Sequence, residues 1–148
     1  MKRLSYFLVL VLLATVSGCG SGNNTTNNVG LFGNWNVVMY PNGSSSPSYV
    51  FGMEISQEGG SNYSGSSITY NGSVAIPSNM CINGNTLTST ATTSGSNFTM
   101  TVTDKTTSTV ITVNGSLATQ TTTLSGTYNN LASQACAASS GTVTMSPQ

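Results

Sequence analysis

Apolar and polar residues alternate along most of the chain beyond residue 30. The segment 98–103, Phe-Thr-Met-Thr-Val-Thr, is the clearest case, because every second side chain is apolar and the others are threonines. A period of two places the apolar side chains on one face of a β-strand and the threonines on the other. After residue 19 no segment keeps the 3.6-residue period of an amphipathic helix, so the pattern predicts an all-β domain.

Short turn signals rich in Gly, Asn, Pro and Asp separate the alternating runs. They are Pro41-Asn42-Gly43, Glu58-Gly59-Gly60, Asn83-Gly84-Asn85, Ser94-Gly95-Ser96 and Asp104-Lys105. The runs between them predict strands near residues 31–40, 48–57, 61–70, 86–93, 97–104, 107–118, 121–129 and 140–146. Short connections favour an antiparallel up-and-down meander, which closes into a small barrel of about eight strands and so loses its edges.

The pair Asn114-Gly115 has two interpretations. Asn-Gly is a strong signal for a hairpin turn, which would divide the segment 107–118 into two short strands. Ile111, Val113 and Leu117, however, keep the two-residue register on both sides of the glycine. We therefore expect one continuous strand across this pair.

The first residues of the chain follow a different pattern. Lys2 and Arg3 precede an apolar run of about thirteen residues, 4–16, interrupted only by one Ser and one Thr. A helix needs roughly 20 apolar residues to cross a bilayer, so this run is typical of a signal peptide. It ends in Val-Ser-Gly-Cys at 16–19, which resembles the lipobox of bacterial lipoproteins. The alternatives are an ordinary secretory signal with a chance cysteine and an uncleaved membrane anchor.

The lipobox resemblance implies cleavage before Cys19 and attachment of a diacylglyceryl group to its thiol. It divides the chain into a signal peptide at 1–18, a lipidated cysteine with a flexible tether at 19–29, and a barrel domain at 30–148. The tether is rich in Gly, Ser and Asn, which form flexible coil. Gly20 follows the cysteine where the family's inner-membrane signal is Asp. The expected location is the outer membrane, with the lipid on Cys19 as the membrane contact.

Two cysteines, Cys81 and Cys136, remain after Cys19 is assigned to lipid. An even remainder in an exported protein predicts one disulfide, and two free thiols are the alternative. The bridge would tie two segments with weak strand patterning, 77–85 and 130–139, near one end of the barrel. Closing a loop of about 55 residues stabilises the fold by roughly 4 kcal/mol in the chain-entropy model.

Charged residues are scarce. Beyond the signal peptide the chain has one base, Lys105, and three acids, Glu54, Glu58 and Asp104, with no histidine. A nucleic-acid partner requires clustered Lys and Arg, so it is excluded. Without histidine, Ser-His and Cys-His nucleophiles are excluded too. The cysteines and carboxylates are an unsuitable set for zinc, and we expect no metal or cofactor.

The charged side chains are expected to be structural or hydrated. Lys105 follows Asp104 in a predicted turn and is expected to pair with it. Glu54 and Glu58 share one strand face only if the strand continues past Gln57. Paired carboxylates cleave glycosides, but Glu58 belongs to a turn signal, so we expect both glutamates to be solvated.

Gly33 and Trp35, at the start of the first predicted strand, form a Gly-x-Trp motif that resembles those of the lipocalins and of the avidin type. The segment 124–128, Leu-Ser-Gly-Thr-Tyr, is similar to avidin-type strands. The resemblance implies an eight-stranded barrel in which Trp35 closes the floor or lines a ligand cavity. The arginine that packs across the tryptophan in lipocalins has no counterpart here. The domain as a whole is similar to Thr/Ser-rich lipoproteins of environmental bacteria.

These observations favour a lipid-anchored, non-enzymatic binding or structural module at the cell envelope, with a surface glycan or protein as partner. The alternative is a lipocalin-like carrier of a small apolar ligand in the barrel interior. It rests on Gly33, Trp35 and an aromatic set expected to face inward. That set is Phe51, Tyr63, Phe98 and Tyr128. A filled interior favours the module and a lined cavity favours the carrier.

Overall fold

The computed structural model describes residues 30–117 and 123–148. The predicted signal peptide, tether and lipidation site Cys19 lie outside these residues. The described part of the chain contains eight strands and no helix. Accordingly, it holds no helix of the length and hydropathy that crossing a membrane requires.

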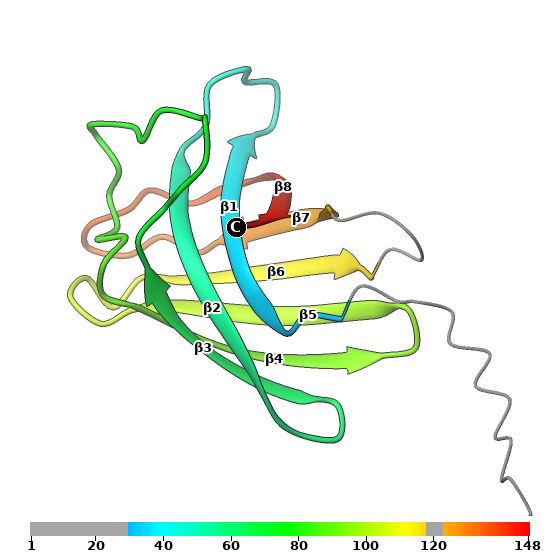
Figure 1. Ribbon diagram of the computed structural model, residues 1–148. Helices are drawn as coiled ribbons and strands as arrows, with labels where there is room; N and C mark the ends of the chain where they lie inside the picture. The colour runs from blue at the N-terminus through cyan, green and yellow to red at the C-terminus, as the bar shows by residue number, and fades with distance from the viewer. Residues whose placement is uncertain (1–29, 118–122) are drawn as a thin grey trace, which may run out of the picture.

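The strands form one closed antiparallel barrel in sequence order, with β8 paired to β1 (Figure 1). They are β1 (Gly33–Pro41), β2 (Tyr49–Gly59), β3 (Asn62–Ile68), β4 (Leu87–Ser94), β5 (Asn97–Asp104), β6 (Val110–Ser116), β7 (Leu124–Asn130) and β8 (Ser139–Pro147). The predicted all-β, eight-stranded up-and-down barrel is confirmed. Asn114 and Gly115 lie inside β6, as the continuous register predicted.

Two of the strands, the third and the sixth, begin or end inside their predicted bounds next to connections that extend from the barrel. The third was expected to reach residue 70 and ends at Ile68. The sixth was expected from residue 107 and begins at Val110. Residues 106 and 107 instead hydrogen-bond the carboxylate of Asp104, which holds them in a turn.

Alternate side chains point inward and fill the barrel. The methionines of β1, β2, β5 and β8 are fully buried, and their unbranched, flexible side chains suit the irregular gaps of a curved core. They are Met39, Met53, Met100 and Met145. Val113 and Leu124 also have no exposed area. A cavity large enough for a ligand would leave accessible surface on the side chains around it, so the interior is filled.

Glycines in β6 and β7 make room for the core side chain of Phe98. Gly115 and Gly126 are paired across the two strands. A Cβ on Gly115 would lie 2.5 Å from the ring of Phe98, and a Cβ on Gly126 would lie 2.2 Å from the carbonyl oxygen of Asn114. The missing side chains therefore let the Phe98 ring cover the backbone and let the two strands approach closely.

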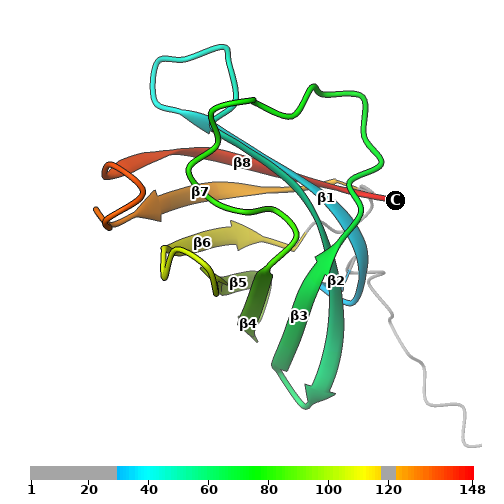
Figure 2. The ribbon, with the colours of Figure 1, turned by 90° about the vertical axis from the view of Figure 1, so that its left-hand side faces the viewer.

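The two ends of the barrel differ in their connections. At the end that we call the floor, β2–β3 and β4–β5 are joined by tight turns. At the other end, the loop end, four connections extend from the barrel, at 42–48, 69–86, 105–109 and 131–138. Figure 2 faces the loop end and shows these connections around its rim. Residue 30 enters at the floor end, next to Trp35.

Candidate functional site

Trp35 closes the floor of the barrel. Its indole nitrogen donates a 2.8 Å hydrogen bond to the carbonyl oxygen of Leu31, and both side chains are buried. Gly33, between them, has φ of +131°, a region that side-chain-bearing residues rarely adopt. The Gly-x-Trp motif thus turns the entering chain across the barrel end. Leu31 covers the interior there, and Trp35 lines no open cavity.

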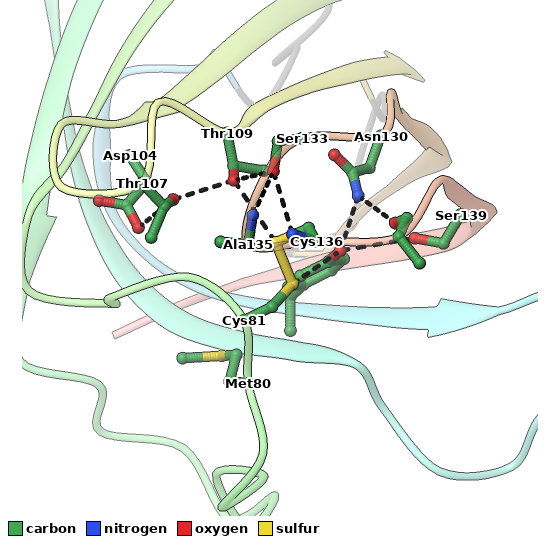
Figure 3. The surroundings of a disulfide bond; sticks show 12 residues. Met80, Cys81, Asp104, Thr107, Thr109, Asn130, Ser133, Ala135, Cys136 and Ser139 are labelled. Carbon is green, nitrogen blue, oxygen red and sulfur yellow. Dashed lines mark hydrogen bonds between the residues drawn. A yellow bond between two sulfur atoms is a disulfide. The ribbon is translucent and has the colours of Figure 1, made fainter.

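A disulfide joins Cys81 to Cys136 at the loop end, which confirms the predicted pairing (Figure 3). It links the 69–86 connection to the 131–138 connection, with 5.3 Å between the two Cα atoms. Cys136 is buried and Cys81 packs against the core. The bridge holds together two long segments that have few strand hydrogen bonds of their own.

Asp104 is the buried acid of the loop end, with 1% of its surface exposed. Its carboxylate accepts hydrogen bonds of 2.7 and 2.8 Å from the backbone nitrogens of Asn83 and Thr106. The hydroxyls of Thr86 and Thr107 donate two more, at 2.7 and 2.8 Å. Burial raises the pKa of this carboxyl, but the four hydrogen bonds together lower it by more than burial raises it. The resulting pKa is about 2.

The expected pairing of Asp104 with Lys105 is therefore corrected. Four uncharged donors, none of them Lys105, satisfy the carboxylate, while Lys105 is exposed. Sequence proximity suggested an ion pair, but the carboxylate is held by Thr106 and Thr107 of the turn and by the 69–86 connection. An acid with every lone pair direction occupied fixes the loops and is not free to act as a base.

Hydroxyls continue this network to the disulfide (Figure 3). The Thr107 and Thr109 hydroxyl oxygens lie 2.9 Å apart, within hydrogen-bond distance, and the Thr109 hydroxyl lies 2.9 Å from that of Ser133. The Ser133 oxygen accepts the backbone N–H of Cys136 at 3.0 Å. Asp104 and the disulfide thus belong to one connected structure at the loop end.

Two tyrosines and an amide form a second buried group nearby. The rings of Tyr49 and Tyr128 meet edge to face, with centroids 5.8 Å apart. Asn130 donates through its side-chain nitrogen to the Tyr49 hydroxyl at 3.1 Å and to the Ala137 carbonyl at 2.8 Å. The Tyr128 hydroxyl and the Asn130 side-chain oxygen are buried without a hydrogen-bond partner. Each such group costs about 1–3 kcal/mol.

Burial raises the pKa of the Tyr128 hydroxyl. The hydroxyls of Ser139 and Ser48 lie near enough to lower it in part, although neither forms a hydrogen bond of acceptable geometry with it. Both serines also border a cavity of about 400 Å³, the loop-mouth cavity, between the 42–48 connection and the disulfide. The buried hydroxyl without a partner therefore lies close to two of the serines that line this cavity.

A second concavity is apolar. A groove of about 480 Å³ lies between the 69–86 connection and β2, lined among others by Val50, Ile68, Ile76 and Met80. Ile76 is 55% exposed there. This groove lies outside the barrel wall, whereas the carrier hypothesis places its ligand inside.

The outer face of β4–β8 is uncharged and polar. Apart from Val110, every outward residue of these strands is Ser, Thr or Asn. We call this surface the hydroxyl face: Thr88, Thr90, Thr92, Ser94, Asn97, Thr99, Thr101, Thr103, Thr112, Asn114, Ser116, Ser125, Thr127, Asn129, Ser140, Thr142, Thr144 and Ser146. A shallow basin of about 670 Å³ lies on it over β5–β8.

The remaining candidates lie apart from these cavities. Glu54 and Glu58 are exposed on β2, which does continue past Gln57 but with a register shift there, and Glu58 accepts a hydrogen bond from Ser64. Neither glutamate lines a cavity described above. Among the described residues, no three metal-ligating side chains come together.

The predicted aromatic set largely faces inward. Phe51, Phe98 and Tyr128 are each 2% exposed within the core, and Tyr63 is half-buried against it. These rings pack against neighbouring side chains in the filled interior. The sequence pattern identified their direction correctly, but direction alone does not distinguish packing from ligand contact.

Comparison with known proteins supplies the fold alone. The sequence matches no protein-family model and no curated protein. Among solved structures, a redesigned beta barrel is similar, with a TM-score of 0.55 and 11% sequence identity. The match covers 80% of this chain and 91% of that chain. At this identity the likeness shows a shared barrel architecture and carries nothing about ligands or partners.

Proposed function

We propose that this protein is a lipid-anchored, non-enzymatic binding module of the cell envelope, which contacts neutral polar surfaces such as glycans. The observation that carries the proposal is the hydroxyl face, where five adjacent strands present hydroxyl and amide groups without a charged side chain. Such groups both donate and accept hydrogen bonds, as glycan hydroxyls do. They recognise a neutral partner without the cost of desolvating charges.

The acids of the barrel support the non-enzymatic part of the proposal. Asp104 is buried and holds four hydrogen bonds. Glu54 and Glu58 are exposed outside the cavities. General acid–base catalysis needs a titratable group positioned in a site next to the reacting atoms, and none of these three carboxylates has that setting.

The filled interior gives no support to the alternative, a carrier of a small apolar ligand inside the barrel. Phe51, Phe98 and Tyr128 contact other core side chains there. A ligand among them would have to displace packed methionines and aromatic rings. The module therefore remains the function that the geometry favours.

The position of the anchor also suits a binding module. Residue 30 enters at the floor end, so a lipid on Cys19 would be joined to that end by eleven residues, which span at most roughly 40 Å. A flexible tether of this length lets the domain reach a partner beyond the membrane surface. The loop end and the hydroxyl face, which flanks it, would both be open to such a partner.

Lipidation is tested directly. Labelled palmitate should enter the full chain in a bacterial host and should not enter the Cys19→Ser variant. Fractionation should place the wild type in the outer membrane. Labelling that persists in the variant would refute the anchor at Cys19 without affecting the fold.

Binding is tested with the lipidated protein in detergent on dextran, amylose and chitin beads. We expect retention that changes little with salt, because the contact is uncharged. The triple change of Thr99, Thr127 and Thr142 to Val keeps the β-branched shape and removes three hydroxyls, so retention should fall. The same three positions changed to Ser serve as the matched control. A steep loss with salt, or no retention on any bead, would count against the proposal.

A further inference from the structure

The loop-mouth cavity has walls that are held in place before any ligand arrives. On one side, Asn42 is bound to Ser140 of β8 by its backbone nitrogen at 2.9 Å and its side-chain nitrogen at 3.1 Å. On the other side, Cys81 is fixed by its disulfide to Cys136. A cavity with fixed walls loses little conformational entropy on binding.

The lining of the cavity restricts the charge of its ligand. Its residues are Ser, Pro, Tyr, Asn, Ala and a disulfide-bonded Cys, none of which carries a charge. An ionic ligand would lose hydration there without gaining a counter-charge. The ligand is therefore neutral.

The lining also requires polar groups on the ligand. Ser48, Ser139 and Asn79 present hydroxyl and amide groups to the cavity, and the unpartnered Tyr128 hydroxyl lies behind the two serines. A purely apolar ligand would bury these groups without partners. Pro41 and Pro47 add apolar surface on the same wall.

We infer that the loop-mouth cavity binds one neutral sugar unit. A sugar ring combines a rim of hydroxyls with an apolar C–H face, which matches serines and an amide beside prolines. The cavity volume of about 400 Å³ lies at the small end of ligand sites, which suits a single sugar ring. This inference rests on the proposed function and names its specific site. The hydroxyl face contacts a glycan broadly, and the cavity holds the sugar unit at the end of that glycan.

The test uses full-length lipidated protein in detergent and three probes: methyl glucoside, methyl N-acetylglucosaminide and glucuronic acid. Binding is measured by saturation-transfer NMR and titration. At least one neutral sugar should bind, and glucuronic acid should bind at least about tenfold more weakly. Ser139→Ala together with Ser48→Ala should weaken the neutral sugar about tenfold. Thermal unfolding of the double variant checks that its fold is retained.

The matched control is Ser66→Ala together with Ser73→Ala, two exposed serines outside both the loop-mouth cavity and the hydroxyl face, which should bind the monosaccharides as the wild type does. Sugar binding that is unchanged when Ser48 and Ser139 are replaced would overturn the cavity site and leave the proposed function standing. Failure of all three sugars to bind, with bead retention intact, would do the same. Equal binding of glucuronic acid would overturn the neutral-ligand inference.

Discussion

The two ends of the barrel solve the problem of closure in different ways. At the floor, Trp35 and Leu31 seal the core with apolar surface, and the one polar atom of the indole is paired locally. At the loop end, closure depends on a disulfide, a buried carboxylate and a chain of hydroxyls from distant segments. The floor is simple and complete, whereas the loop end is polar and keeps unpartnered groups. Both ends contribute to stability, the floor through apolar packing and the loop end through polar and covalent links.

Changing Trp35 to Ala should have the largest effect, because it opens the floor. The expected loss is about 4 kcal/mol of unfolding free energy, the usual cost of deleting a buried aromatic ring. Urea denaturation followed by circular dichroism measures it. Trp35→Phe is the control, since it keeps an aromatic ring in the floor and loses the hydrogen bond to Leu31 with part of the packing. An equal loss in both variants would show that the hydrogen bond, not the ring, closes the floor.

Removing the disulfide should weaken the loop end by a similar or slightly smaller amount. Cys81→Ala with Cys136→Ala releases a loop with a sequence separation of 55 residues, for which the chain-entropy model predicts a loss of about 4 kcal/mol. Hydrogen exchange should rise in the 69–86 and 131–138 connections while β5 and β6 remain protected. Uniform loss of protection across the barrel would mean that the two ends are not separate in stability.

Acid should weaken the loop end through Asp104. The pKa of this carboxyl is about 2 in the folded protein against 3.8 for an unperturbed group. Because the folded pKa is the lower one, its stabilisation, about 2 kcal/mol, is complete above about pH 5 and is lost as the pH falls through the folded pKa of about 2. Urea midpoints between pH 2 and 6 measure this. Asp104→Asn should be less stable at pH 6 and should show a flatter pH profile over that range.

Tyr128→Phe should have the smallest effect and the opposite sign. It removes a buried hydroxyl that has no hydrogen-bond partner and leaves the edge-to-face contact with Tyr49 in place. We expect stability to rise by up to about 1 kcal/mol, measured by the thermal midpoint. Tyr49→Phe is the comparison, because its hydroxyl accepts a hydrogen bond from Asn130 and its loss should destabilise. A destabilised Tyr128→Phe would show that this hydroxyl has a partner in solution.

The difference between the ends also explains what the sequence could predict. The strands and the core of residues such as Met100 and Val113 follow from a two-residue period, which is a local property. Closure of the floor could be predicted from Gly33 and Trp35, which lie two positions apart. The disulfide could be predicted from the even number of cysteines that remain after Cys19.

The loop end could not be predicted in the same way. The donors to Asp104 come from residues as far away as Asn83, inside a connection that has no period. Nothing in the local sequence distinguishes a hydrated turn aspartate from a buried one. The loop-mouth cavity likewise joins Ser48 to Ser139, which only barrel closure brings together. Polar sites built from distant loops carry no sequence signature of their own.

The pairing of β1 with β8 would matter for the export that we propose. The first strand has its partner in Ser139–Pro147, at the far end of the chain. A chain that crosses a membrane from its N-terminus exposes β1 first and β8 last, so the barrel cannot close until the final strand has emerged. In a chain exported as we propose, this seam would delay the native state until translocation is complete. The chain would stay unfolded during transport and become resistant to unfolding only afterwards.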